Sequence, residues 1–358
     1  MTADMAAPLG VAVVGAGYWG PNLIRNFRTS ADWDLVAVCD LDTARAEAAV
    51  GARSGVLVTD SLDEVLARDD VHAIAIATPA RTHQQIAEAA LRAGKHVLVE
   101  KPLADSVTAG RAMVETAQAQ GLVLMTDHTF CYTPVVQKIR ELVHSGSLGE
   151  ILFVDSVRIN LGLVQPDVDV FWDLAPHDLS ILDFILPGGL RPTGVAAQGA
   201  DPIGAGKSCV GYLSLPLPGG ALAHVHVNWL SPTKIRQMVI GGSERTLVWD
   251  DLNPQQRLSV FDRGVDLVQQ TVDSADRRTA SISYRLGDTW APALPEREAL
   301  GQMVTEFAAS IREGRPAATD GTAGLRVLSV LEAAATSVRA RGAQVDIAEQ
   351  APSLELVR

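Results

Sequence analysis

Short apolar runs alternate with amphipathic segments along the first third of the chain, at the spacing of strand–helix units. Residues 9–17 form an apolar run ending in glycine, which is typical of a buried parallel strand, and a helical pattern follows over 20–29. This alternation predicts an α/β fold in which a doubly wound parallel sheet with right-handed crossovers occupies residues 1–126. Further strands are predicted at 35–40, 56–60, 73–79, 96–102 and 122–128.

The pattern changes after residue 126, where alternating apolar and polar positions predict antiparallel strands. Residues 127–358 are therefore predicted to form a second, α+β domain with a mainly antiparallel sheet. A short helix is expected at 178–186, and the polar stretch 274–285 is predicted to be a mobile loop. Strands are expected at 151–160, 208–218, 220–230, 235–242, 245–251 and 257–263, and longer helices at 132–149, 298–314 and 322–342.

Length and composition narrow the class of protein. A chain of 358 residues exceeds what one compact core normally holds and suits two domains. The net charge of −12 argues against nucleic acid or an anionic membrane as the main partner. The three cysteines are scattered, so neither a disulfide framework nor a zinc site is implied. Because the sequence has neither a long apolar run nor a signal-peptide pattern, we expect a cytoplasmic protein.

The first predicted strand leads into a G-x-G-x-x-G motif, formed by Gly15, Gly17 and Gly20, and a helix follows. These glycines allow a tight turn and close approach of the backbone to a pyrophosphate at the positive end of the helix. Asp40 ends the next strand, where a carboxylate accepts hydrogen bonds from the adenosine ribose and repels a 2′-phosphate. This context predicts a Rossmann dinucleotide site that prefers NAD to NADP.

Several other residues are predicted to line the cofactor site. Most lie near the carboxyl ends of strands on the edge of the sheet where ligands of open α/β sheets bind, and two lie in the glycine-rich turn. Of these, His83 is expected near the nicotinamide pocket. The set comprises Tyr18, Trp19, Thr78, Pro79, His83, Glu100 and Lys101.

Lys101 and the pair Asp173 and His177 are the predicted catalytic residues. Lys101 follows the fifth strand and precedes a proline, a place from which its ammonium group can hold a substrate oxygen and stabilise a developing alkoxide. Asp173 and His177 are four residues apart, so they share a face if a helix begins there, with Pro176 in its first turn. Histidine titrates near neutrality and can accept the proton of a hydroxyl group. A solvated lysine and a structural Asp–His pair are the alternatives.

Three further polar residues lie in predicted strands of the second domain. Arg158 is a candidate for binding a substrate phosphate or carboxylate, with a surface salt bridge as the alternative. His224 and His226 alternate with apolar residues and so share one strand face with Asn228. No third metal ligand is apparent near them, so a polar sheet face or a subunit contact is expected and no metal site is predicted.

With these motifs in this order, the chain resembles the Gfo/Idh/MocA oxidoreductase family over nearly its whole length. The resemblance rests on GAGYWGPN, IATPARTH, GKHVLVEKPLA, SLGEI, DLAPHDLSIL and NWLSPTKIR, and within the family it points to nucleotide-sugar and antibiotic-sugar dehydrogenases. It implies that Gly15, Gly17, Gly20 and Asp40 bind NAD and that Lys101, Asp173 and His177 act on the substrate. It also implies an open-faced second sheet through which members form dimers or tetramers.

The sequence thus predicts NAD-dependent oxidation of a secondary hydroxyl on a sugar or nucleotide-sugar. In this hypothesis Lys101 and His177 both contact the substrate hydroxyl, and Asp173 orients the histidine ring or relays the proton. Three alternatives stay open: an inositol or cyclitol dehydrogenase, a keto-sugar reductase that uses NAD(P)H, and a sugar-sensing regulator without catalysis.

Overall fold

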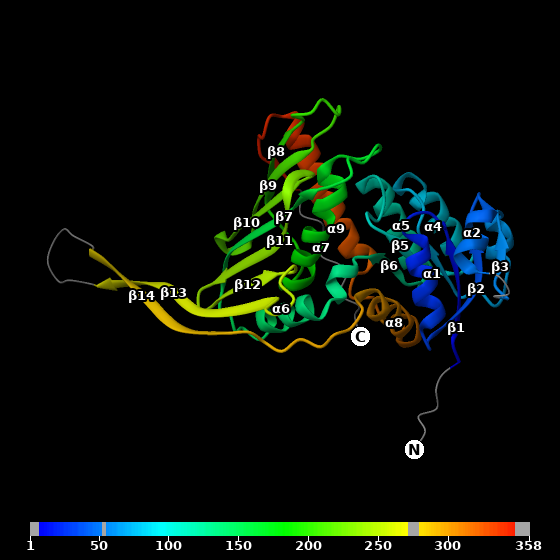
Figure 1. Ribbon diagram of the computed structural model, residues 1–358, viewed down its shortest axis with the longest axis horizontal. Helices are drawn as coiled ribbons and strands as arrows, with labels where there is room; N and C mark the ends of the chain where they lie inside the picture. Colours follow the sequence, from blue (N-terminus) through cyan, green and yellow to red (C-terminus); the bar gives the residue numbers. More distant parts are fainter. Residues whose placement is uncertain (1–6, 52–54, 271–278, 348–358) are drawn as a thin grey trace, which may run out of the picture. The chain divides into compact units, whose positions relative to one another are not determined.

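A computed structural model describes residues 7–51, 55–270 and 279–347 of the chain. The chain divides into two compact units, each with its own sheet (Figure 1). Unit one comprises residues 1–137, 179–184 and 296–332, and unit two comprises 138–178, 185–295 and 333–358. Among the described residues, no helix is both long and apolar enough to cross a membrane.

The sheet of unit one has six parallel strands in the order β3-β2-β1-β4-β5-β6. The order reverses between β1 and β4, which is the switch point where open α/β sheets bind their ligands. The central strands are buried along their length because helices cover both faces of the sheet. The strands are β1 (Leu9–Val14), β2 (Trp33–Cys39), β3 (Leu57–Thr59), β4 (Ala73–Ile76), β5 (His96–Glu100) and β6 (Leu124–Asp127).

Helices of unit one begin where the sequence supplies caps. Asp42, Ser61 and Ser106 each accept a hydrogen bond from a backbone N–H in the first turn of the helix that follows. Helix α8 comes from much later in the chain and packs on the same sheet layer, where the Trp33 indole N–H donates to the Val304 carbonyl at 2.7 Å. The helices are α1 (Gly20–Thr29), α2 (Thr43–Val50), α3 (Leu62–Leu66), α4 (His83–Arg92), α5 (Val107–Gln120) and α8 (Ala299–Glu313).

The sheet of unit two has nine strands in the order β14-β13-β12-β11-β7-β10-β9-β8-β15. Among the strands that the structure describes in this sheet, only the β7–β10 pair is parallel. The predicted fold class, a parallel sheet followed by a mainly antiparallel one, is therefore confirmed. The strands are β7 (Ile151–Leu161), β8 (Gly194–Ala200), β9 (Val210–Pro216), β10 (Leu222–Asn228), β11 (Leu230–Gly242), β12 (Thr246–Asp250), β13 (Leu258–Gln270), β14 (Thr279–Trp290) and β15 (Val345–Asp346).

The remaining α-helices of the described residues are α6 (Pro134–His144), α7 (Val170–Ile185) and α9 (Gly321–Arg339). The predicted start of α7 at residue 178 is wrong, because Asp169 begins the helix earlier by accepting hydrogen bonds from the N–H groups of Phe171 and Trp172, both at 3.0 Å. Pro176 therefore lies inside the helix and not in its first turn, and the predicted position of Pro176 is also wrong.

Strands β13 and β14 continue past β12 as a two-stranded ribbon, which Figure 1 shows projecting from the sheet. The predicted mobile loop at 274–285 is wrong for residues 279–285, which belong to β14, while 274–278 lie outside the described residues.

Candidate active site

The glycine-rich turn between β1 and α1 has two glycines that the protein itself requires. Gly15 has a φ of 99°, and a Cβ atom there would lie 2.7 Å from the Ala77 carbonyl oxygen. A Cβ on Gly20 would lie 2.2 Å from the Gly15 carbonyl oxygen. By contrast, a Cβ on Gly17 would meet no atom within 4 Å, so the space beside Gly17 is open. Open space beside the turn is what the approach of a pyrophosphate needs.

Asp40, at the carboxyl end of β2, is held against this turn. Its Oδ2 accepts a hydrogen bond from the Ala16 N–H at 2.6 Å, and its Oδ1 accepts one from the Asp42 N–H at 2.8 Å. Arg45 Nη1 lies 4.0 Å from the same Oδ1. These contacts fix the carboxylate in place and leave each oxygen a further lone pair. Its predicted bond to the adenosine ribose stays a prediction.

The two aromatic residues of the turn differ in environment. The Tyr18 side chain is 98% exposed, which is unusual for a tyrosine. The Trp19 indole N–H donates to Asp127 Oδ2 at 3.2 Å, so the glycine-rich turn is bonded to the end of β6. Asp127 was absent from the predicted site, although its position at the end of a parallel strand could have identified it.

Two carboxyl groups lie side by side where β5 and β6 end, because Glu100 and Asp127 are partners in the parallel ladder. Glu100 is half-buried, with its Oε1 shielded from solvent, and desolvation together with the nearby Asp127 raises the pKa of its carboxyl group well above the usual range. Its Oε2 accepts the Lys101 backbone N–H at 3.1 Å. Asp127 also accepts a short hydrogen bond from the Thr129 hydroxyl.

Lys101 directly follows Glu100 in the chain, and its side chain is half-buried. The peptide bond to Pro102 is cis. His128, one residue beyond Asp127, is buried, and neither of its ring nitrogens has a hydrogen-bond partner among the described residues. Burial, with a smaller contribution from the charge of Lys101, lowers the pKa of His128 to about 3, so the ring is neutral at physiological pH.

His83 connects two of the loops at this edge of the sheet. Its Nε2 lies 2.7 Å from the Thr78 carbonyl oxygen and its Nδ1 lies 3.0 Å from the Pro102 carbonyl oxygen. The ring is buried, and that burial lowers its pKa despite the two carbonyl contacts. His83 thus holds the loop after β4 to the loop that carries Lys101, while its predicted contact with the nicotinamide stays a prediction.

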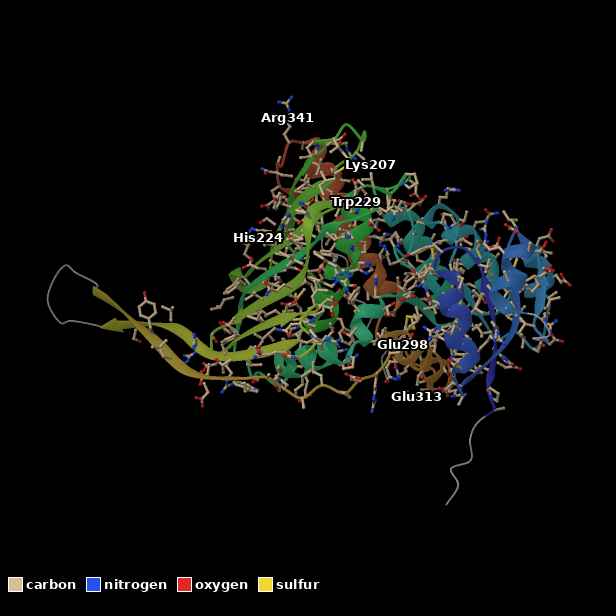
Figure 2. The ribbon with its side chains drawn as sticks, in the orientation of Figure 1. Lys207, His224, Trp229, Glu298, Glu313 and Arg341 are labelled. Atoms are coloured by element: carbon tan, nitrogen blue, oxygen red, sulfur yellow. The ribbon has the colours of Figure 1, made fainter. Side chains whose placement is uncertain are left out.

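In unit two, helix α7 carries both predicted acid/base residues. Asp173 Oδ2 accepts a hydrogen bond at 3.0 Å from the indole N–H of Trp229, a fully buried residue labelled in Figure 2. His177 lies one turn further along α7 and is half-buried. A spacing of four residues in a helix places the two side chains on one face.

Arg158 lies in a buried ion pair. Its Nε donates to Asp178 Oδ2 at 2.7 Å and its Nη2 to Asp178 Oδ1 at 3.1 Å, and the Ser156 hydroxyl donates to the same carboxylate at 2.9 Å. The two charged side chains are 4% and 3% exposed. These two hydrogen bonds between the guanidinium and the carboxylate connect β7 to α7, next to His177. Arg158 therefore does not form the surface salt bridge that was the alternative. Its predicted contact with substrate stays a prediction.

The register of β10 places His224, His226 and Asn228 on one face of the sheet, as the sequence pattern predicted. This face points away from α7, and His224 lies on it (Figure 2). His226 stacks on Tyr212 with 4.4 Å between ring centres, and His224 lies 3.6 Å from an Asp155 oxygen. The described residues hold no group of three or more metal-ligating side chains.

The fold and the cofactor turn define an NAD-binding oxidoreductase. Residues 9–128 match a family model described as "Oxidoreductase family, NAD-binding Rossmann fold", and residues 136–248 match the GFO/IDH/MocA C-terminal domain. The chain belongs to the GFO/IDH/MocA oxidoreductase family, so the predicted family, enzyme class and cofactor are confirmed.

Similar proteins cover almost the whole chain. UDP-N-acetylglucosamine 3-dehydrogenase of Acidithiobacillus ferrooxidans is 30% identical in sequence over 91% of this chain and 95% of its own. The solved structure of that enzyme superposes with a TM-score of 0.78 at 26% identity, covering 95% of this chain and 100% of its own. Inositol 2-dehydrogenase of Rhizobium meliloti is 28% identical over 94% of this chain and 98% of its own. A protein of gentamicin A biosynthesis, solved in complex with NAD, is 25% identical with a TM-score of 0.78, covering 97% and 98% of the two chains.

Proposed function

We propose that the protein oxidises a secondary hydroxyl of a sugar or nucleotide-sugar with NAD. The observation that carries the proposal is the organisation of the carboxyl edge of the first sheet, where the glycine-rich turn is bonded through Trp19 to the residues around Lys101. Membership of the family and the nucleotide-sugar dehydrogenase among its relatives support the substrate class. We also propose residues 1–126 as the dinucleotide-binding domain and 127–358 as the domain for substrate binding and oligomerisation.

The chain fits NAD at the glycine-rich turn. Gly15, Gly17 and Gly20 would hold the pyrophosphate, since the space beside Gly17 is open and the N-terminus of α1 follows at once. Asp40 would hold the adenosine ribose with its remaining lone pairs. The bound nicotinamide supplies a hydride acceptor.

Residues of the chain itself would bind the substrate oxygen and accept the hydroxyl proton. In this proposal the Lys101 ammonium donates to the substrate oxygen and stabilises the negative charge that develops on it. His177 accepts the hydroxyl proton as general base. Asp173 orients the imidazole ring, and the Trp229 indole in turn fixes the Asp173 carboxylate.

Replacement of the two reacting groups tests this assignment. Lys101→Met and His177→Ala should each lower kcat by about 100-fold or more while NAD still binds. The assay is absorbance of reduced nicotinamide with NDP-hexoses, free hexoses and inositols, and calorimetry measures NAD binding. Arg140→Met, outside the proposed groups, is the matched control for charge removal. Full turnover in either active-site variant would refute the proposed roles.

A polyol dehydrogenase is the second candidate, because an inositol 2-dehydrogenase is similar over 94% of this chain. The same groups would serve that reaction, so the substrate panel decides between the two. A rise in absorbance with inositols alone supports the polyol enzyme, and a rise with NDP-hexoses supports the nucleotide-sugar enzyme. Consumption of NADH with keto-sugars alone supports a reductase.

We further propose that a second copy of the chain covers the open face of the unit-two sheet, giving a homodimer or homotetramer. That face mixes Tyr212, His224 and His226 with exposed apolar side chains such as Phe153 and Leu222. The ribbon formed by β13 and β14 extends the same face, because Val265 continues the alternation of Phe261 and pairs with Tyr284.

The ribbon itself supports this interface. One face of the ribbon carries three exposed apolar or aromatic side chains: Val265 (60% exposed), Tyr284 (75%) and Leu286 (83%). An isolated two-stranded ribbon is marginally stable in water, so apolar side chains at these positions favour a covering partner.

A further inference from the structure

Glu100 and Asp127, at the ends of β5 and β6, form an acid pair that contacts both the glycine-rich turn and the Lys101 backbone. Glu100 and Asp127 lie opposite each other in the ladder; Asp127 is buried, and Glu100 is half-buried with its Oε1 shielded from solvent. Two adjacent buried carboxylates repel each other strongly, so one of them keeps its proton. The hydrogen bonds around them identify which one.

Asp127 is surrounded by donors. The Trp19 indole N–H reaches its Oδ2, and the Thr129 hydroxyl reaches its Oδ1. A carboxylate that accepts several hydrogen bonds is stabilised in its charged form. Both oxygens of Asp127 therefore already have a donor.

Glu100 has the opposite environment. One oxygen, Oε2, accepts the Lys101 backbone N–H, whereas no donor among the described residues reaches the buried Oε1. A carboxyl oxygen without a donor is satisfied if it carries a proton and donates, and the neighbouring carboxyl group in the ladder is that of Asp127. This arrangement favours a proton on Oε1 of Glu100, shared with the neighbouring Asp127 carboxyl group.

We propose that Glu100 and Asp127 share one proton and act as a positioning pair that fixes the Lys101 loop to the glycine-rich turn. The pair then carries one negative charge, and Lys101 directly follows Glu100 in the chain. It receives Trp19 from the cofactor turn on one side and the Lys101 backbone on the other. Two buried histidines at this edge, His83 and His128, have lowered pKa values and add no charge at neutral pH.

Two isosteric variants distinguish the partners. Glutamine in place of Glu100 still donates to Asp127, so Glu100→Gln should lower kcat by less than about tenfold. Asparagine in place of Asp127 removes the charge that the donors stabilise, so Asp127→Asn should lower kcat by about 100-fold. The reverse order of severity would overturn the assignment of the proton to Glu100.

Two spectroscopic measurements do not depend on turnover. In the infrared spectrum of the whole protein, the band of a protonated buried carboxyl group should vanish in Glu100→Gln. In Asp127→Asn, the emission of Trp19, isolated by subtracting the spectrum of Trp19→Phe, should shift because its acceptor has lost its charge. A band that persists in Glu100→Gln, or Trp19 emission that does not change, refutes the pair.

The kinetic arm rests on the proposed function, and the spectroscopic arm does not. An inactive wild-type protein with the infrared band and the Trp19 shift would refute the proposed oxidation and leave the shared proton standing. Normal oxidation without the band would refute only the shared proton.

Discussion

The buried ion pair of Arg158 and Asp178 yields a prediction about stability and about the role of Arg158. Asp178→Ala removes the carboxylate that accepts both guanidinium donors and the Ser156 hydroxyl. Loss of one partner of a buried pair costs about 3–5 kcal/mol, because the other charge stays buried without it. With about 2–4 °C per kcal/mol for a domain of 150–250 residues, the melting temperature should fall by about 6–20 °C.

The assay is a thermal melt followed by circular dichroism at pH 7. Asp155→Ala is the matched control, because Asp155 is a half-exposed carboxylate on the same strand as Arg158, and its loss should change stability by no more than about 0.5 kcal/mol. A melting temperature of Asp178→Ala equal to that of wild type would refute the burial argument.

A double replacement separates a structural role of Arg158 from substrate binding. Arg158→Met combined with Asp178→Leu replaces both charges with apolar groups, which is often neutral or stabilising in buried sites. If Arg158 acts only within the pair, this variant should fold and keep its KM for the sugar substrate. A folded double variant that loses saturation by NDP-sugars but not by polyols would instead support the predicted substrate contact.

Three further predictions concern single residues. His83→Leu has no ring nitrogen to place against the Thr78 and Pro102 carbonyls. Calorimetry should therefore show weaker NAD binding, and denaturation should show a loss of about 1–3 kcal/mol; unchanged values in both would contradict the role of His83. In the folded state His128 stays neutral down to about pH 3, whereas in the unfolded state it binds a proton below about pH 6.5. Its contribution to the free energy of unfolding should therefore fall by about 1.4 kcal/mol per pH unit as the pH drops below 6.5. His128→Asn should make the difference in unfolding free energy between pH 7 and pH 5 smaller, while other buried histidines such as His83 keep their own contribution; a difference equal to that of the wild type would contradict the prediction. Leu286→Asp should dissociate the oligomer, as measured by sedimentation. Leu163→Asp is the control, since Leu163 is 76% exposed and Leu286 83%, and it should leave the oligomer intact. A monomeric wild type would refute the whole interface.

The sequence by itself determined the first sheet and its cofactor edge. The apolar runs, the glycines at 15, 17 and 20, and the acid at 40 are all local signals, since a parallel strand and its following turn are specified by neighbouring residues. The same-face position of His224 and His226 was likewise predictable, because strand alternation has a fixed period of two.

Tertiary structure decided what those residues contact. Nothing in the spacing of Arg158 and Asp178, twenty positions apart, indicates a buried fork, and the pairing of Glu100 with Asp127 depends on which strands become neighbours. The early start of α7 was missed because its cap, Asp169, lies in a polar stretch that resembles a loop. Local patterns specify elements, whereas the partners of buried polar groups follow from packing between distant segments, where each such group must find a hydrogen bond.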